Sequence, residues 1–312
     1  MKKLTDRLNH IRTISSDIVL NTPLISIDEN AIGKVAKRLS YKIASDDNIN
    51  QIALSENLST SEKIALSVLF SSIHYCFVDP TSCSDYSYFD NDIKYERSKA
   101  FWRTLIIQKK FKWDNLEDVL HMSKQDWRDI LHLDDSGTTL WDSENRYIRL
   151  LSFAEYLQER KVSFDNFFTT YSTAQKVYTL LYESGLFNDD FLKRLQVEIV
   201  WLDEIAQHDG LQFDGRINEL TAMADYRLPQ LLMQLGVIEF ADGNLEKLNS
   251  QLTDKKLERT IRAATIYSCQ KIANVNNVSE ARVDRLLWNM SQEKINDGEM
   301  KIPAMRVATH CY

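Results

Sequence analysis

Residues 59–73, STSEKIALSVLFSSI, define the fold class. Ser59 and Glu62 have the spacing of a capping box, in which two side chains pair with free N–H groups at the start of a helix. The apolar residues that follow, from Ile64 to Ile73, cover nearly every side of that helix. The sequence therefore predicts a helix at the centre of a hydrophobic core.

Further helices are predicted on both sides of this segment from apolar periodicity and from cap residues. Asp28 is expected to cap an early helix, and Asp189 or Asp190 a long helix later in the chain. The expected helices cover residues 28–44, 98–110, 123–131, 143–161, 174–183, about 190–207, 217–223, 229–235, 245–272 and 279–289.

Turn-forming residues are scarce, with 8 Gly and 4 Pro in 312 residues. Sheet proteins of this size need more of them, and no alternating stretch is long enough to predict a sheet. A hydrophobic fraction of 44% supplies a core. We therefore expect an all-α fold, a single compact helical domain over residues 1–312 that has room for two helical lobes, with residues 1–14 as a loosely ordered start.

Charge and cysteine usage limit the partners and the compartment. The net charge of -7 argues against a protein that grips a nucleic-acid duplex through its phosphates. No apolar run approaches the length of a bilayer span, and MKKLTDRLNHIRTISSD at the start has no signal-peptide pattern. The four cysteines, Cys76, Cys83, Cys269 and Cys311, form no close pair. Reduced thiols in a cytoplasmic protein, with no membrane and no stable nucleic-acid complex, are the expectation.

Common catalytic motifs are missing from the sequence. None of the six histidines belongs to an HExxH arrangement, and we expect no metal and no cofactor. There is no GxxxxGK[ST] or GxGxxG loop for phosphate and no GxSxG elbow for a nucleophilic serine. Any phosphate must therefore be bound by Arg, Lys and helix N-termini.

Residues 74–90, HYCFVDPTSCSDYSYFD, form an irregular stretch directly after the predicted central helix. Such loops often hold binding residues, because a rigid element presents them. The alternative is that the aromatic side chains only fill the core. The pattern alone leaves both interpretations open.

Residues 221–230, TAMADYRLPQ, contain the candidate for chemistry. Pro229 suits the first turn of a helix, and Leu228 before it is expected to leave helical geometry. Asp225 would then lie between two helices, where the dipole of the next helix keeps its carboxylate ionised. Cleavage of an N-glycosidic bond needs such a carboxylate, to stabilise the cationic sugar or to take a proton from water. From the residues alone, helix capping or an ion pair with Arg227 is the simpler interpretation.

Residues 224–232, ADYRLPQLL, resemble the ADYR-[VL]-PQ signature of the queuosine 5′-phosphate N-glycosylases, also called queuosine salvage proteins. Order and spacing agree with that family from about residue 15 to the C-terminus. The other segments that resemble it are IHYCFVD (73–79), FLKRLQ (191–196), LGVIEFADGNLEKLN (235–249), IRAATIYS (261–268), VDRLLW (283–288) and the tail 303–312. Such a series is far more specific than one motif.

The resemblance implies an all-helical fold similar to helix-hairpin-helix DNA glycosylases. It also implies hydrolysis of queuosine 5′-monophosphate, a small-molecule nucleotide, to queuine and ribose 5-phosphate without a metal. By the matching motifs, Asp225 is the catalytic carboxylate, and Lys193 contacts the phosphate or the sugar hydroxyls as a point charge. Arg227 and Arg306 are candidate substrate contacts. For Arg306, pairing of the tail with a helix surface is an equally open alternative.

The stretch 74–79 is expected to line the pocket for the base, as a hypothesis from chemistry and position. His74 lies in it, Tyr75 and Phe77 suit stacking on a flat deazaguanine, and Asp79 suits hydrogen bonds from its N–H groups.

The sequence also departs from the family pattern, which has Asn at His74, Trp at Val78, Arg at Ala308 and Tyr at Cys311. Two other functions stay open: a glycosylase acting on another modified nucleotide or on bases in nucleic acid, and a nucleoside-binding protein without catalysis.

Overall fold

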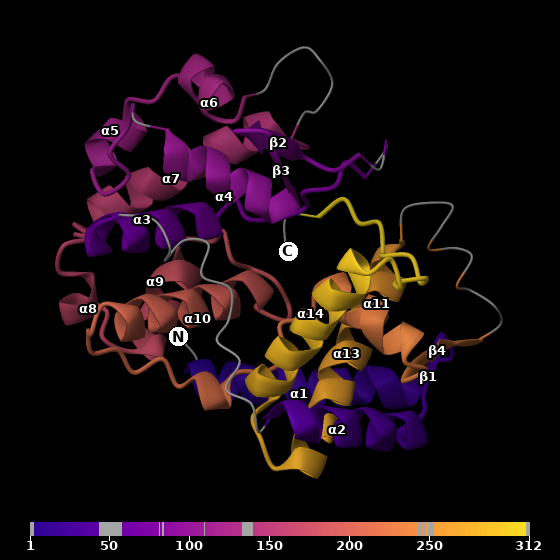
Figure 1. Cartoon of the computed structure of the whole chain (residues 1–312). Coiled ribbons are helices and arrows are strands. Elements are labelled where there is room, and N and C mark those ends of the chain that lie inside the picture. The colour runs from indigo at the N-terminus through magenta and orange to yellow at the C-terminus, as the bar shows by residue number, and fades with distance from the viewer. Residues whose placement is uncertain are drawn as a thin grey trace. The chain divides into compact units, whose positions relative to one another are not determined.

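The computed structural model describes residues 3–43, 58–80, 82, 84–108, 110–132, 140–241, 245, 248 and 253–309. Within these ranges the protein is mostly helical (Figure 1). The helices are α1 (Leu4–Asn21), α2 (Glu29–Ile43), α3 (Thr60–Ser71), α4 (Arg97–Ile107), α5 (Leu116–Leu120), α6 (Lys124–Ile130), α7 (Ser143–Glu159), α8 (Phe167–Thr170), α9 (Ala174–Glu183), α10 (Lys193–His208), the 3-10 helix η1 (Ile217–Glu219), α11 (Arg227–Gln234), α13 (Lys255–Asn276) and α14 (Glu280–Asn296).

Two short antiparallel sheets, which the sequence pattern was too brief to predict, accompany these helices. Strand β1 (Ile25–Ile27) pairs with β4 (Ile238–Phe240), and β2 (Ser87–Asp90) pairs with β3 (Ile93–Glu96). The second pair is a hairpin whose two connecting residues, Asn91 and Asp92, have φ angles of 46° and 67°. Positive φ at both positions matches the twist of a tight hairpin, and Asn and Asp tolerate it better than most residues.

The chain forms two compact units. The first unit is made of residues 1–49, 190–196 and 216–308, and the second of residues 50–189, 197–215 and 309–312. Helix α10 thus gives its first turn to the first unit and the remainder to the second. That residues 1–312 act as one domain stays a prediction.

In the first unit, α13 packs against α1, α2, α11 and α14. It is buried along most of its length, because small residues such as Ala263 and Ala264 let neighbouring helices approach. The loose order expected for residues 1–14 is wrong for residues 4–14. These residues belong to α1, because Leu4, Leu8 and Ile11 lie on one face and are buried.

In the second unit, α3 has the predicted capping box. The Ser59 side chain accepts from the Glu62 N–H, and the Glu62 carboxylate accepts from the Ser59 N–H at 2.9 Å. Every α3 residue from Lys63 to Ser71 is buried, so the prediction of a central helix is confirmed.

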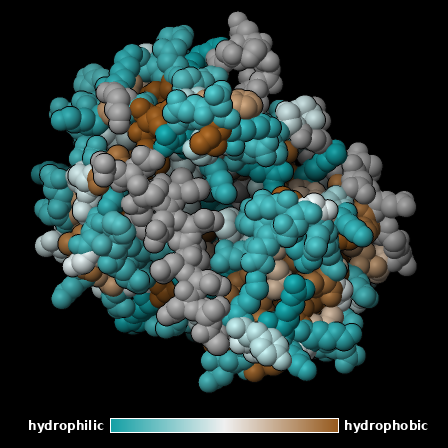
Figure 2. Space-filling view, viewed as in Figure 1, coloured by the Kyte–Doolittle hydropathy of each residue, from teal (hydrophilic) through white to brown (hydrophobic). Residues whose placement is uncertain are grey.

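The side that Figure 2 shows is mostly hydrophilic, with small scattered groups of hydrophobic residues. Within the described ranges, no helix is both long and apolar enough to span a bilayer.

Several local predictions were tested by these elements. Asp28 caps α2 by accepting from the N–H groups of Asn30 and Ala31 at 2.7 and 3.1 Å, as expected. Helix α10 begins at Lys193, so Asp189 and Asp190 lie too far upstream to be its cap, and that prediction is wrong. The two other corrections concern the neighbourhood of Asp225.

Only Ile217–Glu219 are helical in the segment expected as a helix over 217–223. Helix α11 also begins earlier than predicted, at Arg227, so Leu228 is helical. Pro229 takes the third helical position, where its missing N–H has no partner within the helix to lose. The connection that carries Asp225 is therefore longer than the sequence indicated.

Of the helix expected over 245–272, residues 255–272 lie in α13, while residues 246–247 and 249–252 lie outside the described residues.

Candidate active site

Residues 220–226 connect η1 to α11 without helix or strand. Their backbone polar groups must therefore find partners elsewhere. The N–H of Thr221 donates to Gln196 Oε1 at 2.8 Å, and the N–H of Met223 donates to Asp284 Oδ2 at 2.7 Å. Arg262 Nε donates to the carbonyl of Ala224 at 3.0 Å. Side chains from α10, α14 and α13 thus hold this connection in place.

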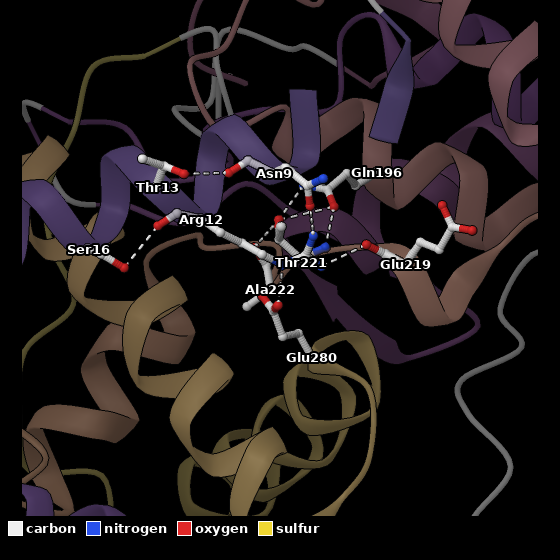
Figure 3. Close-up of polar contacts among 9 residues, drawn as sticks. All are labelled: Asn9, Arg12, Thr13, Ser16, Gln196, Glu219, Thr221, Ala222 and Glu280. Carbon is white, nitrogen blue, oxygen red and sulfur yellow. Dashed lines mark hydrogen bonds and ion pairs between the residues drawn. The ribbon is translucent and has the colours of Figure 1, made fainter. Parts of the chain in front are cut away.

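Gln196 links the turn of Lys193 to the segment of Asp225. Its amide oxygen accepts from Thr221, and its Nε2 donates to Thr221 Oγ1 at 2.9 Å (Figure 3). The same Nε2 donates to the Phe191 carbonyl at 3.0 Å. Gln196 and Thr221 are fully buried. Because the side-chain amide of Gln196 is hydrogen-bonded through both its oxygen and its nitrogen and is buried, this link fixes the position of Thr221 relative to α10.

A second link comes from Arg12 on α1. Its Nε is 2.6 Å from Glu280 Oε1, and its NH2 donates to the Glu219 carbonyl at 2.8 Å (Figure 3). Burial raises the pKa of Glu280, and the charge of Arg12 opposes this. The backbone of Ala222 also lowers the pKa of the Glu280 carboxyl.

Asp225 ends this connection at the N-terminus of α11. Its Oδ1 accepts from the N–H groups of Arg227 and Leu228, at 2.6 and 3.3 Å. Among the described residues, no donor is bonded to its second oxygen, Oδ2, and the side chain is only partly buried. Asp225 therefore caps the helix, as the simpler interpretation held, while one oxygen stays available.

The alternative of an ion pair between Asp225 and Arg227 is not found among the described residues. The Arg227 guanidinium donates to Gln230 Oε1 at 3.0 Å and lies 5.0 Å from the centre of the Tyr226 ring. The Arg227 guanidinium thus contacts Gln230 on α11 and the Tyr226 ring. A role for Arg227 in binding substrate stays a prediction.

Buried charges surround Asp225. Lys193 is the first residue of α10, 9% exposed, after Leu192 with a φ of 52°. Burial lowers the pKa of Lys193, and the charges of Asp225 and Asp284 oppose this. Burial likewise raises the pKa of Asp225, opposed first by Lys193 and then by the Leu228 N–H and Arg262. The opposite charges of Lys193 and Asp225 thus each lower the cost of burying the other.

This arrangement can stabilise a cation that forms close to Oδ2 of Asp225. The other oxygen is held by two backbone N–H groups, so the carboxylate cannot rotate freely. In surroundings poor in water, a fixed negative charge stabilises a developing positive charge more strongly than it would in solution. Oδ2 is also free to accept a proton from a nearby water molecule.

Arg146 on α7 pairs with three carbonyls of the irregular stretch 73–79, which belongs to the second unit. Its fully buried guanidinium donates to the carbonyls of Ile73, Tyr75 and Cys76, the last at 2.8 Å, and its Nε donates to the Trp141 carbonyl at 2.9 Å. It also lies 4.0 Å from the centre of the Tyr75 ring. No local sequence pattern pointed to Arg146.

Aromatic rings pack around His74. Its ring lies 4.9 Å from that of Phe77 and 5.1 Å from that of Trp201, which in turn lies 5.3 Å from Trp102. Phe77 is 5% and Tyr75 1% exposed, so both fill the core of this unit, as the alternative interpretation held. Contact of these rings with a base stays a prediction.

Three more positions from the sequence can be placed. The Asp79 carboxylate accepts from the Ser82 N–H at 2.8 Å, so it organises its own turn. Arg306 is partly buried, and its carbonyl accepts from Thr253 at 2.8 Å. Ala308 is exposed, and Val78 is partly buried. The position of Cys311 lies outside the described residues.

Sequence reasoning missed Gln196, Arg262 and Asp284 as parts of the site. Each belongs to a segment that carries the resemblance: FLKRLQ, IRAATIYS and VDRLLW. Those segments were the available signal. A partner far along the chain gives no local pattern, so the individual side chains were not singled out.

A family model described as queuosine salvage protein matches residues 107–312. The chain is 31% identical over 137 residues to the queuosine 5′-phosphate N-glycosylase/hydrolase of Schizosaccharomyces pombe, covering 39% of this chain and 39% of that protein. It is 29% identical over 114 residues to the protein of that name from Dictyostelium discoideum, and 29% over 124 residues to that from Mus musculus. These two matches each cover 34% of this chain and 36% of the relative. The matches thus span well under half of each relative.

Proposed function

The chain belongs to the queuosine salvage protein family, and from this membership we propose that it hydrolyses queuosine 5′-monophosphate to queuine and ribose 5-phosphate. The names of the relatives supply the substrate. The observation in the structure that supports the proposal most is Asp225, with one oxygen fixed at a helix N-terminus and the other without a hydrogen-bond partner among the described residues.

In the proposed reaction the bond between C1′ of the ribose and the base breaks, and the sugar gains cationic character. Oδ2 of Asp225 stabilises this cation and takes a proton from the attacking water, whose oxygen bonds to C1′. The base leaves with the electron pair of the broken bond and takes up a proton from solvent, and Asp225 then releases to solvent the proton that it took from the water. Queuine has carbon in place of N7, so a general acid cannot assist at that atom. Stabilisation of the sugar cation therefore carries more of the catalysis.

Lys193 is the proposed cationic contact of the substrate. Its charge is held between Asp225 and Asp284, and an ammonium group there suits the sugar hydroxyls or the 5′-phosphate. Arg227 and Arg306 are further candidate contacts, and His74, Tyr75, Phe77 and Asp79 are the proposed contacts of the base. These assignments rest on the motif positions and on chemistry.

The test is to incubate the purified protein with queuosine 5′-monophosphate, queuosine and GMP in parallel, with a chelator present, and to detect free base by mass spectrometry. Release of queuine from the monophosphate alone supports the proposed reaction, a metal-free mechanism and recognition of the phosphate. Release from none of the three contradicts the proposal and favours binding without catalysis.

The remaining proposals concern partners and place of action. The net charge of -7 supports the absence of a stable nucleic-acid complex, and an electrophoretic shift of any oligonucleotide at low salt would contradict it. Among the described residues, Cys76 and Cys269 are buried and form no disulfide, which is compatible with the proposed cytoplasmic location. The likeness to helix-hairpin-helix DNA glycosylases stays a prediction.

A further inference from the structure

Asp284 on α14 is a buried acid for which the proposed reaction has no step. It is 7% exposed, and its Oδ2 accepts one hydrogen bond, from the N–H of Met223 at 2.7 Å. Among the residues that the structure describes, no lysine or arginine forms an ion pair with it within 4 Å. A buried carboxylate with so few partners is costly to keep ionised.

Asp225 and Asp284 are unequal neighbours. Asp225 has two N–H donors, the N-terminus of an eight-residue helix, and the charges of Lys193 and Arg262. Asp284 accepts from one N–H group, and the charge of Lys193 lowers its pKa as it lowers that of Asp225. When two carboxyl groups affect one another, the one with poorer stabilisation of its anion takes the proton.

We propose that Asp284 is a positioning residue of the active site, which holds the Met223 N–H and carries the proton of an unequal carboxyl pair, so that Asp225 is the ionised member. When Asp284 is neutral, the positive charge of Lys193 stabilises the Asp225 carboxylate alone. The effect on catalysis rests on the proposed function, whereas the distribution of the proton does not.

The other charges near Asp284 agree with this assignment. Burial raises the pKa of Asp284 to about 7, and the charge of Asp225 adds to this, while Met223, Lys193 and Arg285 oppose it. Lys193 comes from α10, Asp225 from the connection before α11, and Arg285 from α14 itself. On α13, the pKa of the buried Cys269 thiol is raised well above its ordinary value, so that it adds no charge.

The first test needs no substrate. An aspartate in an unfolded chain has a pKa of about 3.9. If Asp284 keeps its proton in the folded state, the stability from that proton is fully present below pH 4 and is lost as the pH rises to about 7. Asp284→Asn keeps an acceptor for Met223 but has no such loss. The melting temperature of D284N relative to wild type should therefore rise between pH 4 and 7 and level off above.

Asp225→Asn provides the test of coupling. Without the neighbouring charge the pKa of Asp284 falls, so in the D225N background the same difference should level off at a lower pH. The matched control is Asp297→Asn, at an exposed position at the end of the same helix, for which no such trend is expected. A difference for D284N that is constant from pH 4 to 7, or one that levels off at the same pH in both backgrounds, overturns the proposal.

The second test measures kcat/KM against pH with queuosine 5′-monophosphate. Because the amide of D284N resembles the protonated acid, the wild-type profile should change near pH 7, where Asp284 loses its proton, and the D284N profile should lack that change. A loss of 100-fold or more at pH 6 contradicts a proton-carrying Asp284. If wild type releases no base at all, the proposed function fails, and the melting data still decide the proton on Asp284.

Should D284N fail to fold, the carboxyl carbons of the aspartates can be followed by NMR in wild type and D225N. A buried carboxyl that titrates near pH 7 in wild type and at lower pH in D225N supports the proposal. The absence of such a group in wild type overturns it.

Discussion

Two irregular segments, residues 220–226 and residues 73–79, lie next to helices and rely on side chains to pair their backbone groups. The first is anchored by Gln196, Asp284 and Arg262, each bonded to a different residue. In the second, the side chain of Arg146 pairs with the carbonyls of three residues, and backbone groups of Tyr86 and Ser84 pair with Phe77 and Asp79. The first arrangement surrounds a carboxylate with charges that interact with one another, whereas the second holds a rigid cluster of aromatic rings.

Distributed anchors bring several ionisable groups next to one carboxylate. Around Asp225 the charges of Lys193, Arg262 and Asp284 influence each other, so a change at one alters the pKa of the others. Arg146 has a simpler environment of carbonyls and rings. Burial lowers its pKa to about 10, so it stays charged at neutral pH.

The largest effect is expected for Asp225→Asn, which removes the charge at the centre of the first segment. The amide oxygen still accepts from Arg227 and Leu228, so the cap and the fold should persist. Without the anion, kcat should fall by about 10³-fold, or about 4 kcal/mol of transition-state stabilisation. Mass spectrometry of released base gives kcat, and a melting curve checks the fold. A variant with wild-type kcat removes Asp225 from the mechanism.

The second-largest effect is expected for Arg146→Met, which removes the side chain that pairs with three carbonyls of residues 73–79. Methionine fills similar space but leaves the carbonyls of Ile73, Tyr75 and Cys76 buried without their donor. Unfolding in urea should become easier by about 3 kcal/mol. The control is Arg149→Met, one turn along α7 and half-buried, with less than about 1 kcal/mol expected. Equal losses in both variants would contradict this role of Arg146.

Gln196→Leu tests one of the shared anchors. It leaves the Thr221 N–H and the Phe191 carbonyl unpaired in the core, at a cost of about 2 kcal/mol to the free energy of unfolding. Because Gln196 fixes Lys193 against the segment of Asp225, kcat should fall more than KM changes. Gln196→Glu keeps an acceptor for Thr221 and should recover part of kcat. If kcat and KM are unchanged while stability drops, Gln196 is structural only.

Two helix caps, Asp28 and Ser59, were accessible from the sequence, whereas the anchors of both segments were not. These two residues bond to groups two or three residues away, so short patterns predict them. Gln196 reaches Thr221 across 25 residues, and Arg146 reaches Ile73 across 73. Only the tertiary fold defines such partners.

Asp225 was identified because its motif resembles a family, while its geometry depended on residues that no local rule could bring together. The same limit explains the wrong helix over 217–223. Its residues have helical composition, but Thr221 and Met223 form bonds to Gln196 and Asp284 that a helix would have prevented. Tertiary partners outweighed local propensity there.

Arg12→Met is expected to have the smallest effect, and it tests whether several anchors make the first segment tolerant. Arg12 is partly exposed, with 22% of its side chain accessible, and it reinforces Glu280 and Glu219 rather than holding residues 221–224 directly. A pair so close to solvent should contribute about 1 kcal/mol to stability. Because Gln196, Asp284 and Arg262 keep their own bonds, kcat should stay within about threefold of wild type. Urea unfolding and kcat measured on one preparation decide the matter. A loss as large as that of Arg146→Met would show that the segment depends on a single anchor after all, and that the contrast between the two segments lies in their charges alone.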